Sequence, residues 1–154
     1  MIPGLGAVTA SEVDGILVRI DLGACRNSQT SPALEDFRQQ LEAWSRGELQ
    51  DFQCAWALES VTDFTRKILS ACARIPYGKF ETYSSLAAMA GKPMACRAVG
   101  GALGRNPLPI LIPCHRVMAA KGIGGFSAGL DWKRRLLAIE AGLPQSFSDS
   151  MQSP

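Results

Sequence analysis

The segment that most restricts the fold of this chain is a run of prolines and aliphatic residues between positions 106 and 117. Its sequence, NPLPILIPCHRV, sets three prolines among leucines and isoleucines. Proline fixes its own φ angle and also restricts the residue before it. The run therefore predicts an extended, stiff and largely buried segment, which presents Cys114 directly after Pro113 with little conformational freedom.

The length and composition are those of a folded protein. The chain has 154 residues, of which 47% are hydrophobic and 19% charged, enough for one domain of ordinary size or two small ones. No apolar stretch approaches the roughly 18 residues that a spanning helix needs, so we expect no membrane partner. The first 15 residues lack the basic and apolar regions of a secretory signal.

The cysteines and the single histidine argue against structural cross-links and metals. Five cysteines, an odd number without C-x-x-C spacing, are typical of a reducing cellular interior rather than of a disulfide framework. Because His115 is the one histidine, we expect no metal site and no zinc. We interpret four cysteines as small core residues; they are Cys25, Cys54, Cys72 and Cys96.

Charge divides the chain into two unequal parts. Residues 1–58 hold four arginines and eight acidic residues, a balance of −4, whereas residues 59–143 hold twelve basic and five acidic residues, a balance of +7. This asymmetry predicts that the C-terminal part meets a polyanion; a basic but merely solvated surface is the alternative.

Start and stop signals divide the chain into short elements. Residues 48–60 are expected to be a linker with a short extended piece, and the glycine-rich residues 121–129 a loop. We expect a hairpin over Val13–Leu22 that turns at Asp14-Gly15. One helix is capped by Ser31 and stops at Gly47, and a second is capped by Thr62 and ends at Ile75–Gly78. Three further helices are expected over Tyr83–Ala90, over Pro93–Gly104 and over Trp132–Ala141, the last capped by Asp131.

Two of these helices form a pattern typical of a helix-turn-helix unit. The helices over 83–90 and 93–104 are separated by a turn that contains glycine. The second is rich in small residues, including Ala95, Ala98, Gly100 and Gly101, which let its backbone approach another helix or a phosphate backbone closely. Together with the +7 balance, the pattern favours DNA binding over a packed helix pair without a ligand.

Cys114 is the candidate for reactive chemistry because it adjoins the imidazole of His115. A neighbouring imidazole lowers the pKa of a thiol and raises the thiolate fraction at neutral pH. Glu140 is the one acid in the last helix after Asp131, and it could accept the other ring N–H of His115. The sequence therefore indicates a Cys–His–Glu relay.

The segment Pro109–Val117 carries a PCHR sequence and resembles the active-site signature of the methylated-DNA–protein-cysteine methyltransferases, the O6-alkylguanine–DNA alkyltransferases. The resemblance covers about Thr62 to Gly142, and residues 44–49 match more loosely. The matching blocks stand in the family's order: Tyr83–Ala87, Cys96–Ala102, Arg105–Pro107, Phe126–Leu130 and Leu136–Glu140.

The resemblance implies an α/β (α+β) fold in two parts. Residues 1–58 would form a small N-terminal α/β domain, a ribonuclease H-like remnant with a mainly structural role. Residues 59–143 would form a helical, winged-helix-like DNA-binding domain that contains the helix-turn-helix. The polar residues 144–154 would be a disordered tail.

The resemblance also implies a reaction. Cys114 would take an alkyl group irreversibly from O6 of guanine, once per molecule and without a cofactor. His115 would deprotonate Cys114 through a bound water, Glu140 would orient the ring, and Asn106 would brace the turn. Tyr83 would donate a proton to the departing guanine.

Further residues would contact the nucleic acid, if the family pattern holds. Val117, Ser127 and Phe126 would hold the guanine base. Arg97 would fill the gap that the flipped nucleotide leaves. The remaining DNA contacts would come from Thr65, Tyr83, Ala98, Gly100 and Gly101.

The implied partner is double-stranded DNA that contains O6-alkylguanine, bound from the minor groove by a monomer or cooperatively along the duplex. The implied location is the cytoplasm, at the nucleoid, or the nucleus in a eukaryote. Three features of the loop over the pocket depart from the family pattern: Phe126 stands where many relatives have Tyr, Ala128 replaces a common Gly, and the loop is one residue shorter. These departures concern how well the pocket tolerates bulky alkyl groups. The alternatives are a lesion-binding module without repair activity, a helix-turn-helix regulator and a thiol hydrolase.

Overall fold

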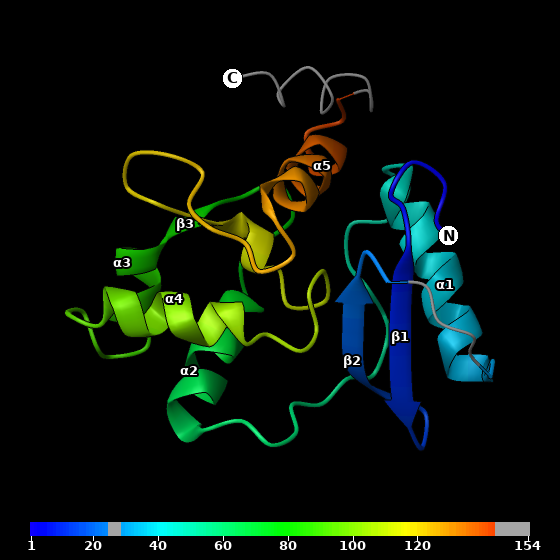
Figure 1. Cartoon of the computed structure of the whole chain (residues 1–154), viewed down its shortest axis with the longest axis horizontal. Helices are drawn as coiled ribbons and strands as arrows, with labels where there is room; N and C mark the ends of the chain where they lie inside the picture. Colours follow the sequence, from blue (N-terminus) through cyan, green and yellow to red (C-terminus); the bar gives the residue numbers. More distant parts are fainter. Residues whose placement is uncertain (25–28, 144–154) are drawn as a thin grey trace.

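The computed structural model describes residues 1–24 and 29–143 and has the expected α+β class. A hairpin and one helix form the N-terminal part, while the remaining helices gather on the other side of the molecule (Figure 1). Whether residues 1–58 and 59–143 are separate domains stays a prediction. The expected tail and Cys25 lie outside the described residues.

The N-terminal part is a two-stranded sheet packed on a helix. Strands β1 (Val8–Val13) and β2 (Ile16–Leu22) pair antiparallel around the predicted Asp14-Gly15 turn. The sequence prediction began the hairpin at Val13 and missed β1, whose residues VTASEV are mostly polar or small. Helix α1 (Pro32–Ser45) begins as predicted, with the Ser31 hydroxyl accepting the Leu34 N–H.

The helix-turn-helix unit is confirmed, with shorter helices than predicted. Helix α2 (Asp63–Cys72) is capped by Thr62 and ends before the predicted stop. Helix α3 (Tyr83–Met89) is capped by Thr82, and helix α4 (Cys96–Gly104) follows it. The prediction that α4 starts at Pro93 was wrong: it has no side-chain cap, and its first residue is Cys96, which is exposed rather than a core cysteine.

The proline segment is buried as predicted but is not extended throughout. Ile110 has a φ of 76°, and the chain then closes into a single 3₁₀ turn, η1 (Cys114–Arg116). Strand β4 (Val117–Met118) follows and pairs in parallel with strand β3 (Glu81–Thr82), directly before α3. This pairing connects the segment that carries Cys114 to the helix-turn-helix.

Helix α5 (Leu130–Glu140) closes the described chain. Asp131 was expected to cap it, but the helix follows Gly129, which has a φ of 103° and no capping side chain. A glycine can adopt this left-handed φ without the clash that a Cβ would cause, so the backbone begins the helix one residue before Asp131. Asp131 instead lies 3.6 Å from Arg134 in the first turn.

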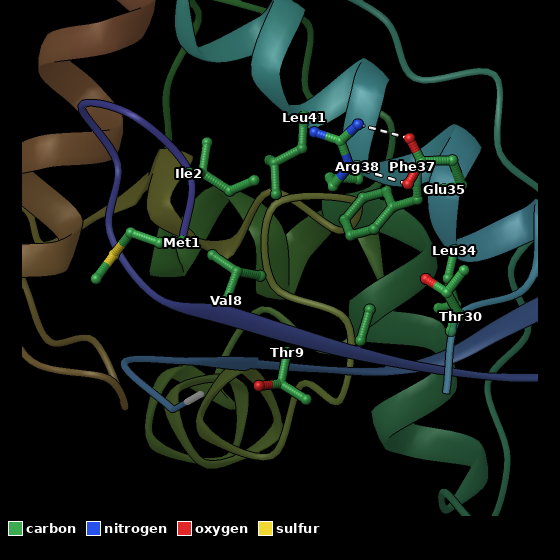
Figure 2. A pocket seen from close by; sticks show the side chains of 11 residues that line it. Met1, Ile2, Val8, Thr9, Thr30, Leu34, Glu35, Phe37, Arg38 and Leu41 are labelled. Atoms are coloured by element: carbon green, nitrogen blue, oxygen red, sulfur yellow. Dashed lines mark hydrogen bonds and ion pairs between the residues drawn. The ribbon is translucent and has the colours of Figure 1, made fainter. Parts of the chain in front are cut away.

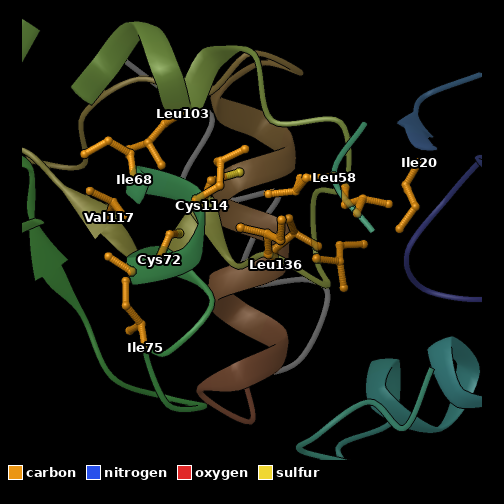
Figure 3. Packing of buried hydrophobic residues seen from close by; sticks show 14 of the residues in the cluster. Ile20, Leu58, Ile68, Cys72, Ile75, Leu103, Cys114, Val117 and Leu136 are labelled. Atoms are coloured by element: carbon orange, nitrogen blue, oxygen red, sulfur yellow. The ribbon is translucent and has the colours of Figure 1, made fainter. Parts of the chain in front are cut away.

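The N-terminal part is hydrogen-bonded to the elements around Cys114. Ile20 N–H of β2 donates to Pro107 O at 2.8 Å, and Arg135 of α5 donates to Leu5 O at 2.6 Å. One buried cluster runs through both parts, and Figure 3 shows Ile20, Leu58, Cys114 and Leu136 within it. A cavity of about 210 Å³ between β1 and α1, shown in Figure 2, shares no lining residue with the pocket at Cys114.

Candidate active site

Cys114 lines a cavity of about 230 Å³ that several of the predicted site residues share. Its side chain is 6% exposed, so it is buried but accessible from the cavity. α3, α4, η1 and the loop after β4 each contribute to the walls. The lining residues are Tyr83, Gly100, Leu103, Gly104, Cys114, Gly125, Phe126 and Ser127.

The predicted contact between His115 and Glu140 is present. His115 Nε2 lies 2.8 Å from Glu140 Oε1, and both side chains are buried. His115 comes from η1 and Glu140 from the last residue of α5, 25 positions later. Because a carboxylate can only accept, this contact places the ring proton on Nε2 and leaves Nδ1 able to accept a proton.

Arg116 completes a buried ionic cluster that sequence reasoning missed. Its Nη2 lies 2.6 Å from Glu140 Oε1, and its Nη1 donates to Ile75 O at 2.6 Å. Its guanidinium also lies 5.7 Å from the centre of the Tyr77 ring. One residue after His115, it therefore binds η1 to α5 and to the end of α2. The adjacency of Arg116 to the PCH sequence was the available signal.

Burial sets the protonation states of the relay. It lowers the pKa of His115 by more than Glu140 raises it, so the imidazole is neutral at pH 7. Burial works to raise the pKa of Glu140, but the hydrogen bonds from His115 and Arg116 outweigh it and hold that pKa below its usual value. Glu140 is therefore ionised beside a neutral imidazole.

The pKa of the Cys114 thiol differs from the sequence prediction. Burial raises the pKa of Cys114 above its usual value, while the Asn106 amide and the positive charge of Lys133 oppose this shift. The prediction that the imidazole depresses the pKa of the free thiol was wrong, because desolvation outweighs the favourable neighbours. Cys114 is consequently a protonated thiol at neutral pH and must lose its proton when it reacts.

Asn106 lies where the predicted bracing role requires. Its Nδ2 donates to Ile112 O at 3.0 Å, and its Oδ1 accepts the Leu108 N–H at 2.9 Å. Both bonds close the turn of the proline segment two residues before Cys114. Val117 is buried on β4, so it can offer its backbone but not an exposed side chain.

Lys133 is the second site residue that sequence reasoning missed. It is completely buried, and its ammonium donates to Val117 O at 2.6 Å and to Gly125 O at 3.0 Å. Burial lowers its pKa to about 8. A lysine within an amphipathic helix usually indicates the solvated face, so no local signal marked it.

Tyr83 joins the helix-turn-helix to the loop over the cavity. Its hydroxyl oxygen accepts the Gly125 N–H at 3.1 Å and lies 3.5 Å from Gly125 O. The loop passes so close that a Cβ on Gly124 would lie 2.8 Å from the Tyr83 hydroxyl. Phe126 and Ser127 follow in the same loop, at the cavity wall.

The predicted DNA-contacting residues differ in their exposure. Arg97, Ala98 and Gly101 of α4 are exposed, and Gly100 lines the cavity. Thr65 is 2% exposed, and its hydroxyl interacts with Thr62 and Arg105 inside the protein. The structure therefore corrects the prediction for Thr65, whose side chain is not presented to a DNA surface.

Neither a metal cluster nor a spanning helix is found in the described part of the chain. Across residues 1–24 and 29–143, no three His, Cys, Asp or Glu side chains lie together as metal ligands would. No helix in these same residues has both the length and the apolar character to cross a membrane.

Gly124→Ala should lower the free energy of unfolding by about 1–3 kcal/mol, because Gly124 has a φ of 77° and a Cβ would meet Tyr83. Gly125→Ala is the matched control, since a Cβ there has open space. Urea unfolding of the two variants measures the difference. Equal losses in both would contradict the close packing of the loop on Tyr83.

Lys133→Met should slow the reaction of Cys114 with iodoacetamide at pH 7, because Lys133, whose pKa is about 8, is charged there and favours the thiolate. The difference from the wild type should shrink above pH 8, where Lys133 loses its charge. Mass mapping of the Cys114 peptide across pH measures this. The exposed Lys121→Met is the control, and a profile shared by both variants would refute the charge effect.

The chain is similar to proteins of one family. The family model "6-O-methylguanine DNA methyltransferase, DNA binding domain" matches residues 63–142. A methylated-DNA–protein-cysteine methyltransferase of Methanosarcina barkeri is 47% identical over 102 residues, which are 66% of this chain and 64% of that protein. The same-named protein of Methanopyrus kandleri is 42% identical over 111 residues, 72% of this chain and 83% of that protein.

A solved structure supports the same assignment across both parts of the molecule. The crystal structure of Mycobacterium tuberculosis OGT in complex with DNA superposes with a TM-score of 0.85 at 32% identity, covering 96% of this chain and 95% of that one. The residues that the family model matches, 63–142, include Cys114, His115 and Glu140. The chain therefore belongs to the 6-O-methylguanine–DNA methyltransferase family, the methylated-DNA–protein-cysteine methyltransferases.

Proposed function

We propose that this protein repairs DNA by moving an alkyl group from O6 of guanine onto its own Cys114. The observation that carries the proposal is the position of that thiol, on the wall of a cavity and next in sequence to His115, whose ring is bound to the buried Glu140. The relatives' names support the reaction, and the structural relative solved with DNA supports DNA as the partner.

The protonation states supply a mechanism for activating the thiol. Cys114 holds its proton in the free protein, whereas neutral His115 has Nδ1 available and Glu140 ready to stabilise an imidazolium. Loss of the thiol proton to His115, through a water, makes the thiolate in place. The sulfur then attacks the alkyl carbon, so that an S–C bond forms as the C–O bond breaks.

The leaving group is guanine, and the electron pair of the broken C–O bond remains on it. A proton from the Tyr83 hydroxyl neutralises the guanine anion, and the proton held on His115 then returns, through water, to the Tyr83 oxygen. The net change moves one alkyl group to sulfur and one proton to guanine. Because the product is a thioether, no thiol is regenerated and each molecule acts once.

A guanine inside a duplex hides its O6, so we propose that the lesion is flipped into the cavity. Exposed Arg97 on α4 would occupy the vacated place in the base stack, and the bare backbone at Gly100 and Gly101 permits close approach. Lys92 and Arg105, both exposed, flank α4 and can contact phosphates. We expect binding that depends little on sequence and weakens with salt.

Exposure of the purified protein to an oligonucleotide that carries O6-methylguanine should add a single methyl group, about 14 Da, to its intact mass. Cys114→Ser should abolish the gain, while Cys54→Ser, a half-buried cysteine outside the cavity, should retain it. Multiple turnovers would instead favour a thiol hydrolase. Tight binding without a mass gain would favour a lesion-binding module or a regulator.

Arg97→Ala should slow methyl transfer from duplex DNA by about tenfold or more, since the unstacking that it offsets is worth a few kcal/mol. Transfer from a single-stranded oligonucleotide should change less, because fewer stacking contacts must be broken. Arg74→Ala, an exposed arginine of the α2 end, is the control. Equal slowing on both substrates would contradict a stacking role for Arg97.

A further inference from the structure

Trp44 of α1 lies against the imidazole of His115, far from it in sequence. The two ring centres are 6.3 Å apart, and the ring planes meet at 77°, the edge-to-face arrangement that aromatic pairs favour. Both side chains are completely buried. His115 is therefore held on two sides, by the Glu140 carboxylate of α5 and by the indole of α1.

The same two rings contain buried nitrogens that have no hydrogen-bond partner. Within residues 1–24 and 29–143, two buried side-chain polar atoms lack a hydrogen-bond partner, and they are Trp44 Nε1 and His115 Nδ1. Unpartnered buried polar atoms are rare in folded proteins and often mark a functional site. One of these atoms is an N–H donor, and the other is the ring position that accepts the proton in the proposed reaction.

A neutral imidazole in a closed site needs its orientation fixed. The Glu140 hydrogen bond fixes the tautomer, but a single contact at Nε2 leaves the ring free to swing about that bond. Trp44 removes this freedom because it packs across the ring. Trp44 also packs against Phe52, and the centres of the two rings are 6.1 Å apart.

We propose that Trp44 is a positioning residue for alkyl transfer, which holds the His115 ring in the orientation and tautomer that leave Nδ1 free to take the thiol proton. This inference rests on the proposed function and assigns the N-terminal part a role in the reaction beyond its expected structural one. Trp44 itself contacts neither the alkyl group nor the sulfur in this role.

The single histidine of the chain provides a direct readout that does not depend on activity. Selective ¹⁵N labelling of histidine gives the signals of one imidazole, and these distinguish the two neutral tautomers and their exchange. In the wild type, we expect one sharp neutral form with the proton on Nε2. In Trp44→Leu, we expect exchange broadening or a mixture of tautomers, together with a changed pH dependence of the His115 signals.

The matched control is Phe37→Leu. Phe37 lies on the same helix, is buried, and packs its ring on Phe52 at 6.0 Å, as Trp44 does, but it lines the cavity of Figure 2 rather than contacting His115. It should weaken the packing of α1 to a similar extent while leaving the His115 signals and the transfer rate near those of the wild type. Trp44→Phe keeps an aromatic ring and should restore most of the wild-type behaviour.

Rates of methyl transfer complete the test. Trp44→Leu should be slower by about ten- to a hundredfold, because small misplacements of a reacting group have effects of this size. Wild-type tautomer and rate in a folded Trp44→Leu would overturn the proposal, as would equal effects in Phe37→Leu. If Trp44→Leu does not fold, Trp44→Met, which removes the ring but keeps a large apolar side chain, is compared with Phe37→Leu by the same criteria. If the wild type never gains a methyl group, the proposed function is refuted. The ¹⁵N signals of His115 in the wild type and in Trp44→Leu would still show whether Trp44 orients the ring.

Discussion

The buried carboxylate of Glu140 is the interaction on which the rest of the site depends. It accepts hydrogen bonds from His115 and Arg116, neighbours in η1, and Arg116 in turn binds the Ile75 carbonyl at the end of α2. Three elements distant in sequence thus meet at one charge. Because removal of one partner from a buried ion pair costs about 3–5 kcal/mol, the cluster fixes the position of η1 as well as the tautomer of its histidine.

The parts of the fold that follow from local chemistry were predictable. Ser31, Thr62 and Thr82 each cap a helix through a hydroxyl that accepts an N–H three residues later, and Gly15 allows the hairpin turn. Local signals failed where backbone geometry competed with them. Asp131 resembles a cap, yet Gly129 begins α5, and the polar strand β1 forms because β2 is available to pair with it.

The candidate site was predictable only in part, for a related reason. Cys114, His115 and Glu140 could be assigned from adjacency and from the family resemblance; in the structure His115 and Glu140 are hydrogen-bonded and Cys114 lines the cavity. The burial of Lys133, the enclosure of Thr65 and the contact of Trp44 with His115 depend on long-range packing. The thiol pKa failed similarly, since desolvation is a property of the folded surroundings and not of neighbouring residues in sequence.

A raised thiol pKa would suit the proposed reaction, in which each molecule uses its nucleophile once. A permanent thiolate would be open to any electrophile that reached it, and each such reaction would remove one molecule irreversibly. In this structure, Cys114 is nearly enclosed and protonated, while the base, its orienting carboxylate and a supporting charge from Lys133 are already in place. In the proposed reaction, reactivity then depends on a substrate that fills the cavity and aligns its carbon with the sulfur. Selectivity would arise from this late deprotonation, and we propose that the N-terminal helix supports the base in that step through Trp44.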